Sequence, residues 1–94
     1  MSKFLKGKMM AKKYIKNKKE LAENLKLIRY WKGLSQAQIA KVLNLERSTY
    51  AYYELGKTEP DIQAIIQLCE LYEIEITDLI TRDGMKKLKN KMRA

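Results

Sequence analysis

The side chains best suited to specific recognition gather in one short stretch of the chain. Arg47 and Ser48 precede Tyr52 by five and four residues, a spacing that places all three on one face of a helix. The guanidinium fork of an arginine matches the O6 and N7 acceptors of guanine, and hydroxyl groups can reach other base edges. We predict that Arg47, Ser48 and Tyr52 contact bases, with a phosphate contact or plain solvent exposure as the alternative for Arg47.

Two short helices joined by a tight turn are predicted to position these side chains, over residues 35–56. Ser35 caps the first helix, and Gln38 three residues later completes a capping box. Asn44 tolerates the left-handed backbone that often closes a helix, and Gly56 ends the second helix. Helix, tight turn, helix is the geometry that places a second helix in the major groove of DNA.

A longer ordered set of residues surrounds this segment and resembles a known family. The set comprises Leu25, Ile28, Arg29, Gly33, Leu34, Ser35, Gln36, Ile39, Ala40, Arg47, Ser48, Thr49, Glu54, Gly56, Lys57, Pro60 and the run 74–80. In this order and at these spacings, the chain resembles the phage-repressor and Cro type of helix-turn-helix domain, also called the xenobiotic response element (XRE) family. The resemblance covers about 56 of the 94 residues, from 25 to 80.

This resemblance implies an all-α fold, a five-helix lambda-repressor-like bundle with basic tails at its two ends. In the family, the arginine that matches Arg29 pairs with the glutamate that matches Glu54, which predicts a structural ion pair here. A snorkelling surface arginine is the alternative. The family glutamine at the position of Gln36 binds a phosphate, and the loop after the second helix lies near the DNA backbone. Phosphate contacts are therefore predicted for Gln36, Thr49 and Lys57.

Several positions depart from the residues that are usual in the family. Glu46 stands where a Ser or Thr cap is common, and its carboxylate either repels a nearby phosphate or accepts a hydrogen bond from a cytosine amino group. Tyr50 is predicted to lie in the core, and Cys69 to be a small buried thiol. Glu73 replaces a helix-ending glycine, so a strained or differently closed turn is expected. The helix that ends there is predicted to start at Ile62, with Ile62 facing inward.

The net charge of +9 is distributed unevenly along the chain. Residues 1–19 sum to +8 and residues 82–94 to +5, whereas residues 20–81 sum to −4. A basic patch is the usual electrostatic footprint of nucleic-acid binding, so the acidic balance of the central part is unexpected. We predict that the core reads sequence while the terminal lysines supply much of the affinity and most of its salt dependence.

One small domain is predicted between the two basic ends. Residues 1–16 form a flexible arm, which either stays solvated or contacts DNA phosphates. The helix-turn-helix domain covers residues 17–82 and begins with Asn17 as a helix cap. Residues 83–94 are either a disordered basic tail, a packing or dimer helix, or an amphipathic binder of membrane or nucleic acid. A helix there would carry an apolar stripe made of Met85, Leu88 and Met92.

The residue types also exclude several classes of function. The chain has one cysteine and no histidine, which excludes a disulfide framework and most metal sites. It has no glycine-rich phosphate loop and no nucleophile beside a base, so we predict no catalytic residue, no enzymatic activity and no cofactor. No apolar run approaches the length of a membrane span, and the N-terminus lacks the apolar core of a secretory signal. We expect a cytoplasmic protein that does not contact membranes.

Together these observations predict a sequence-specific transcriptional regulator that binds double-stranded DNA with the helix Arg47–Leu55 in the major groove. Repression is the commoner role in the family that the chain resembles. Its members usually dimerise, which implies a homodimer that reads two half-sites about 34–36 Å apart. The alternative is a protein-binding module, such as an antitoxin or accessory regulator, that keeps the fold and covers a partner protein. The acidic central part slightly favours that alternative.

Overall fold

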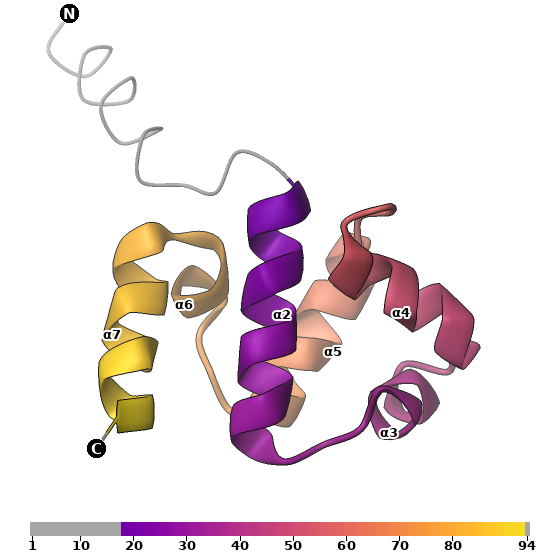
Figure 1. Cartoon of the computed structure of the whole chain (residues 1–94), viewed down its shortest axis with the longest axis horizontal. Coiled ribbons are helices and arrows are strands. Elements are labelled where there is room, and N and C mark those ends of the chain that lie inside the picture. Colours follow the sequence, from indigo (N-terminus) through magenta and orange to yellow (C-terminus); the bar gives the residue numbers. More distant parts are fainter. Residues whose placement is uncertain (1–17, 94) are drawn as a thin grey trace, which may run out of the picture.

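A central helix, α2 (Lys18–Lys32), separates two groups of helices in a computed structural model that describes residues 18–93 (Figure 1). On one side lie the two helices of the predicted helix-turn-helix, α3 (Gln36–Val42) and α4 (Arg47–Leu55). On the other side lie the last two helices, α6 (Ile76–Ile80) and α7 (Arg82–Arg93). The remaining helix, α5 (Ile62–Tyr72), packs behind α2 and α4 and connects the two groups. The predicted all-α fold is therefore confirmed.

The core lies where these helices meet α2. Its fully buried side chains come from five of the described helices: Leu25, Ile28, Ile39, Tyr50, Leu68, Tyr72 and Leu79. Burying an aliphatic side chain of this size contributes about 1.5–3 kcal/mol, so this cluster supplies most of the driving force for folding. Cys69 is buried at the edge of the same cluster, as predicted. No helix in residues 18–93 combines the length and the apolar character needed to cross a membrane.

The helix ends follow the predicted turn chemistry closely. Ser35 and Gln38 form the capping box, in which the Gln38 N–H donates to Ser35 Oγ at 3.1 Å and the Ser35 N–H donates to Gln38 Oε1 at 2.8 Å. Asn44 adopts the left-handed conformation with a φ of 56°, and Gly56 does so at 73°. Glu73 closes α5 in the same conformation, with φ 56° and ψ 45°. The left-handed conformation costs a residue with a side chain about 1–2 kcal/mol relative to an unstrained one. This turn is therefore strained, as expected.

The prediction for Ile62 was wrong, because its side chain is 65% exposed. The inward face of α5 is centred on Ile65 and Leu68. Ile62 and Ile66 are four residues apart and share a different stripe, about a quarter turn away, and Ile66 is 45% exposed. The three-residue step from Ile62 to Ile65 suggested one shared face, but Ile62 lies with Ile66 on the exposed stripe of the helix.

The C-terminal residues form a sixth helix in the described part of the chain, where the sequence predicted five helices followed by either a basic tail or a short amphipathic helix. The preceding helix stops at Ile80, and Thr81 is extended, with φ −117° and ψ 149°. The new helix, α7, buries Met85 and Leu88, and Met92 packs against them in part. The predicted boundary between residues 82 and 83 therefore falls inside the first turn of α7. The predicted arm over residues 1–16 and the Asn17 cap lie outside the described residues.

Gly84 allows α7 to approach α6 closely. The Gly84 N–H donates to Thr81 Oγ1 at 2.9 Å, and the Thr81 hydroxyl donates to the Thr77 carbonyl at 2.6 Å. A Cβ added at Gly84 would lie 2.3 Å from the Thr77 carbonyl oxygen and 2.5 Å from Asp78 Cα. Backbone atoms cannot yield as a flexible side chain can, so only glycine fits at this contact.

Candidate nucleic-acid interface

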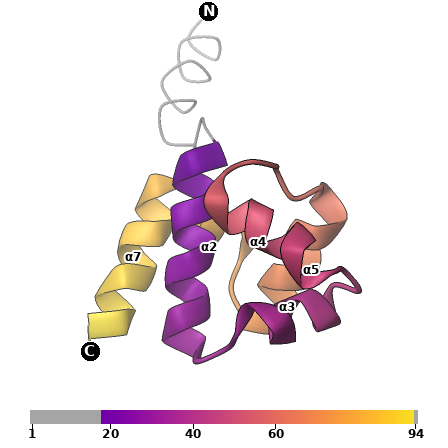
Figure 2. The ribbon, with the colours of Figure 1, turned by 45° about the vertical axis from the view of Figure 1, so that its right-hand side comes forward.

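The helix pair α3–α4 presents the predicted base-contacting residues to solvent (Figure 2). Arg47 and Ser48 are exposed in the first turn of α4, and Tyr52 is 44% exposed one turn later. The opposite side of the helix holds Tyr50 and Glu54, which are both buried. Because α4 is held from its buried side, the structure brings Arg47, Ser48 and Tyr52 together on one free face, as their spacing predicted.

Lys57 lies next to this free face. Its Nζ is 5.3 Å from the centroid of the Tyr52 ring, which is within the range of a cation–π interaction. The Gly56 turn, with its left-handed backbone, directs Lys57 back over α4. The predicted phosphate-contacting lysine and the predicted base-contacting tyrosine therefore form one patch at the C-terminal end of α4.

The predicted pair between Arg29 and Glu54 is present and nearly buried. Arg29 Nε donates to Glu54 Oε2 at 2.6 Å and Nη2 donates to Oε1 at 2.9 Å, so the contact is bidentate. The side chains are 8% and 2% exposed. Arg29 Nη1 also donates to the Leu34 carbonyl at 2.9 Å. One guanidinium therefore ties α2 to α4 and to the loop that leads into α3.

Two further donors complete the environment of the Glu54 carboxylate. The Tyr50 hydroxyl donates to Oε2 at 2.5 Å, and Gln36 Nε2 donates to Oε1 at 3.1 Å. The sequence assigned Tyr50 to the core only, and its hydrogen bond was missed. The four-residue spacing of Tyr50 and Glu54 was the available signal. Gln36, predicted to bind phosphate, donates one amide hydrogen to Glu54. Its second amide hydrogen can be donated to another acceptor.

The network keeps Glu54 ionised in a largely apolar setting. Burial by itself would raise the pKa of this carboxyl, but the hydrogen bonds from Arg29, Tyr50 and Gln36 outweigh that effect and hold the pKa below its ordinary value. The same contact with Glu54 raises the pKa of Arg29. Burial, followed by the hydrogen bond to Glu54, raises the pKa of Tyr50. These groups therefore keep their charge states across the physiological pH range and act as a fixed brace for α4.

A tyrosine pair in the core provides a direct test of this brace. Replacing Tyr50 by Phe removes a hydrogen bond to a buried carboxylate, and we expect a loss of about 1.5–3 kcal/mol in the free energy of unfolding. Tyr72 is the matched control. Its hydroxyl is buried without a hydrogen-bond partner in the described residues, and burial raises the pKa of this tyrosine to about 12.

Tyr72→Phe should therefore leave the unfolding free energy nearly unchanged or raise it slightly. Urea unfolding of the two variants beside the wild type gives the comparison. Equal losses for both variants would mean that the bond from Tyr50 to Glu54 contributes nothing beyond the loss of any buried hydroxyl group.

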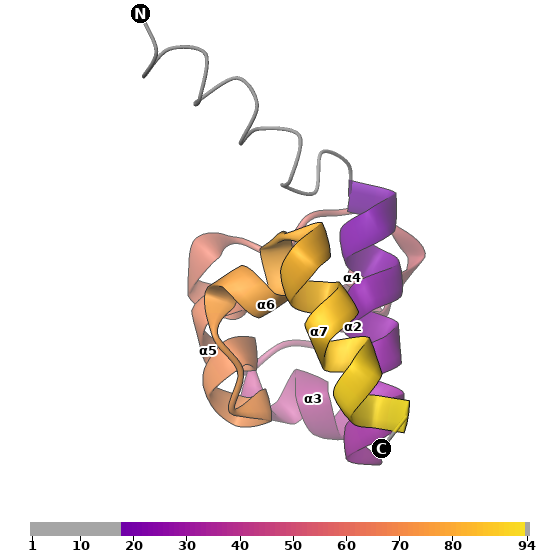
Figure 3. The ribbon, with the colours of Figure 1, turned by 90° about the vertical axis from the view of Figure 1, so that its left-hand side faces the viewer.

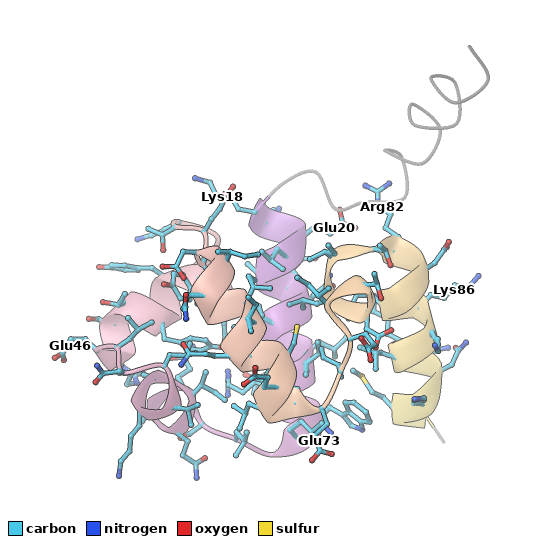
Figure 4. The ribbon with its side chains drawn as sticks, turned by 180° about the vertical axis from the view of Figure 1, so that it is seen from behind. Lys18, Glu20, Glu46, Glu73, Arg82 and Lys86 are labelled. Carbon is cyan, nitrogen blue, oxygen red and sulfur yellow. The ribbon has the colours of Figure 1, made fainter. Side chains whose placement is uncertain are left out.

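The start of α4 carries an acidic residue on the same free surface. Glu46 occupies the N-cap position with an extended backbone, and its side chain makes no capping hydrogen bond. Figure 4 shows the Glu46 side chain pointing away from the body of the protein. Thr49, predicted to contact phosphate, is only half-buried beside it. The first turn of α4 thus offers an exposed carboxylate as well as the Arg47 guanidinium.

Chemically, this site supports recognition by hydrogen bonds and charge. Within residues 18–93, no three His, Cys, Asp or Glu side chains are arranged to hold a metal ion. Two short helices joined at a left-handed turn, buttressed by a central helix and exposing a hydrogen-bonding face on the second, define the helix-turn-helix class.

Comparison with known sequences identifies the family. Residues 25–79 match the family described as Helix-turn-helix, and the chain belongs to this XRE-type helix-turn-helix family. It is 33% identical over 67 residues to an uncharacterised HTH-type transcriptional regulator, YqaE, of Bacillus subtilis, covering 71% of this chain and 58% of that protein. It is 28% identical over 69 residues to the cryptic phage CTXphi transcriptional repressor RstR of Vibrio cholerae, covering 70% of this chain and 62% of that protein.

A solved structure shows the same arrangement of helices. The crystal structure of a transcriptional regulator from Listeria innocua superimposes with a TM-score of 0.61 at 40% sequence identity, covering 64% of this chain and 56% of that chain. The present chain therefore spans just over half the length of this structure and of the two curated relatives, at 56%, 58% and 62%.

Proposed function

We propose that this protein is a sequence-specific, DNA-binding transcriptional regulator that inserts α4 into the major groove. The observation that carries the proposal is the free face of α4, where Arg47, Ser48 and Tyr52 stand together while the other side of the helix is braced by Glu54. A rigid helix with donors and acceptors on its outer face can compare base edges, because the geometry is set before binding. Membership of the helix-turn-helix family supports this assignment.

Phosphate contacts are assigned to the residues around this face. Gln36 retains one amide hydrogen at the start of α3, and the Thr49 hydroxyl lies beside Ser48. Lys57 supplies a cation at the far end of α4. These groups would fix the position of the helix on the duplex, while Arg47, Ser48 and Tyr52 read the bases. Glu46 would add to the discrimination between DNA sequences, either by accepting a hydrogen bond from a cytosine amino group or by repelling a phosphate.

The regulatory outcome is assigned to repression. The similarity to a phage transcriptional repressor supports it, and occupancy of an operator needs no chemistry beyond binding. We further propose a homodimer that reads two half-sites, in the cytoplasm. The test of the dimer is sedimentation with and without a duplex that carries two copies of the selected site at a spacing of about 34–36 Å.

Base reading by Arg47 is tested by its substitution with alanine. Sequences selected by the wild-type protein from a random duplex pool first define the specific site. Arg47→Ala should then weaken binding to that site by about 1–3 kcal/mol and relax one base position, while binding to random duplex changes little. The comparison variant is Arg93→Ala, which removes an exposed arginine at the end of α7 and should affect specific and random DNA equally. An equal loss on specific and random DNA would make Arg47 a phosphate contact instead.

A second candidate function is a protein-binding module with the same fold. The observation that favours it is the pair of exposed apolar side chains Ile62 and Ile66 on α5, which are 65% and 45% exposed. Exposed apolar residues at i and i+4 are typical anchors for a partner helix or a second copy of the chain. Titration with random and selected duplex at two salt concentrations separates the candidates. A protein that binds neither duplex at low salt, yet is captured on a host partner through Ile62 and Ile66, would be such a module.

A further inference from the structure

The last helix exposes five cations. They are Lys86, Lys87, Lys89, Lys91 and Arg93, which lie around the helix outside its buried stripe and are called here the outer face of α7; the exposed Asp83 and Asn90 lie among them. None of these five side chains forms an ion pair with an acidic residue in residues 18–93. Two acidic residues belong to this region. Asp83 is exposed in the first turn of α7, and Glu20 binds Arg82, so that Arg82 and, to a smaller extent, Lys89 lower the pKa of Glu20. The cations outnumber these two carboxylates, so the surface of α7 keeps a net positive charge within the described part of the protein.

The outer face of α7 and the free face of α4 belong to opposite sides of the molecule. Figure 1 places α4 and α7 on the two sides of α2, and in Figure 3 α7 lies nearest to the viewer with α4 beyond α2. In Figure 4 the labelled Lys86 points away from the body on the α7 side, while Glu46 points away on the α4 side. The lysines of α7 thus do not share a surface with the residues proposed to read bases.

The way α7 is packed limits what its outer face can bind. A helix that lies in a membrane interface needs a free apolar side, but Met85 and Leu88 of α7 are buried against the protein. Stable protein interfaces are built around an apolar centre, and no large exposed apolar side chain belongs to α7 within its described residues. Apart from the hollow that Lys89 and Arg93 line together with Leu27 and Met92, this surface offers cations without an apolar centre. Such a surface fits the phosphate backbone of a nucleic acid, which is bound mainly through charge.

We propose that the outer face of α7 is a second, sequence-independent binding surface for the phosphates of duplex DNA, so that one molecule holds two duplex segments at once. This inference rests on the proposed function of α4. The first duplex is read by the free face of α4, and the second is held on the far side of α2 through charge alone. Such a molecule bridges two DNA segments, or two parts of one bent segment, without a second copy of the helix-turn-helix.

The experiment measures bridging directly with the full-length protein. A 30-base-pair duplex of mixed sequence is tethered to beads, protein is added, and capture of a second, fluorescent duplex from solution is recorded across a protein titration. The test variant is Lys86→Gln, Lys87→Gln and Lys91→Gln together, since glutamine keeps helix propensity but removes the charge. The matched control carries Lys→Arg at the same three positions. Circular dichroism of both variants checks that α7 remains folded.

The wild type and the Lys→Arg variant should capture the second duplex, and the Lys→Gln variant should capture at least roughly tenfold less. If three cations contact phosphates, wild-type capture should fall roughly 40-fold between 50 and 200 mM salt, through counterion release. Binding to the tethered duplex should persist in all three proteins. Equal capture by the Lys→Gln variant would overturn the inference and point to a dimer that bridges with two recognition helices.

Two other outcomes are also decisive. If the wild type binds the tethered duplex at 50 mM salt but never captures a second one, α7 does not bind DNA, although the proposed function stands. If the wild type binds no duplex at all, the proposed function itself fails. Vesicles of phosphatidylserine and phosphatidylcholine are added as competitor at equal phosphate concentration. Displacement of the second duplex by these vesicles would show a general anionic-surface binder and would contradict the assignment to DNA.

Discussion

Replacing Glu54 by Gln should lower the free energy of unfolding by about 3–5 kcal/mol, the largest effect expected for any polar substitution in the described chain. The amide has nearly the same shape as the carboxylate, so packing hardly changes. The substitution leaves the Arg29 guanidinium buried without a counter-ion, because both hydrogen bonds from Arg29 to α4 are made to the Glu54 carboxylate. The Tm should fall by roughly 4–8 °C for each kcal/mol lost from the free energy of unfolding.

The interaction itself is isolated by a double-mutant cycle. Arg29→Met replaces the guanidinium with an unbranched apolar side chain and leaves the Glu54 carboxylate buried without a counter-ion. It should therefore also destabilise the folded protein strongly. The double variant, with neither charge, should be far more stable than the sum of the two losses predicts. Glu20→Gln is the matched control, since it makes the same change in the exposed pair with Arg82 and should have a much smaller effect. Additive free energies in the cycle would show that Arg29 and Glu54 do not stabilise each other.

The same pair predicts a pH dependence. The pKa of Glu54 in the folded protein lies below its ordinary value of 4.5, so the folded state favours the ionised carboxylate. Its contribution to stability is complete above the unfolded pKa and is lost as the pH falls through the lower, folded pKa. The difference in stability between wild type and Glu54→Gln should therefore stay constant near neutral pH and narrow below about pH 4.5. A difference that does not change in acid would mean that charge plays no part in it.

Gly84→Ala should have the second large effect, a marked loss in the free energy of unfolding. Intrinsic helix propensity alone would predict a gain instead. Alanine is favoured over glycine inside a helix by about 1 kcal/mol, and Gly84 lies within α7. However, the added methyl would lie 2.3 Å from the Thr77 carbonyl oxygen and 2.5 Å from Asp78 Cα. The backbones of α6 and α7 must separate, and we expect destabilisation of about 3 kcal/mol or more, at the upper end for overpacking.

The control for Gly84→Ala is Asn90→Ala, which changes an exposed position of the same helix. It tests helix propensity alone and should be neutral or slightly stabilising. Urea unfolding followed by circular dichroism measures both variants. If α7 simply detaches in Gly84→Ala, amide hydrogen exchange should show loss of protection in α7 with protection retained at Leu25 and Ile28 of α2. A stability equal to that of the wild type would show that α7 does not dock at this distance.

Detachment of α7 also connects this prediction to the proposed DNA bridging. A detached α7 would expose Met85 and Leu88 and would no longer hold its cations on the side opposite α4. Truncation of the chain before residue 84 would have the same consequence, since it removes two buried side chains from the core. For this reason, point substitutions of exposed lysines test the terminal charge more cleanly than deletion of the last residues does.

The helix-turn-helix could be predicted from the sequence because its determinants are local. The capping box of Ser35 and Gln38, the left-handed Asn44 and the terminating Gly56 act within a few residues of where they stand. The outward face of α4 also follows from spacing alone, since a helix fixes the relative directions of Arg47, Ser48 and Tyr52. The pair of Arg29 and Glu54 joins residues 25 positions apart and was predicted through the family resemblance, not from spacing.

Only the tertiary structure decided how these local elements are covered. Apolar periodicity marks a stripe on a helix but does not say what packs on it. Met85, Leu88 and Met92 allowed a tail, a dimer helix or a surface binder. The packing of α7 against α6 buries Met85 and Leu88 and covers Met92 in part. For the same reason, the sequence wrongly predicted that Ile62 faces the core. It also did not predict the hydrogen bonds from Tyr50 and Gln36 to Glu54. The sequence by itself determined the helix pair and the outward face of α4. Packing around α2 decided that the basic C-terminal helix lies on the opposite side, because that choice depends on contacts between residues distant in the chain.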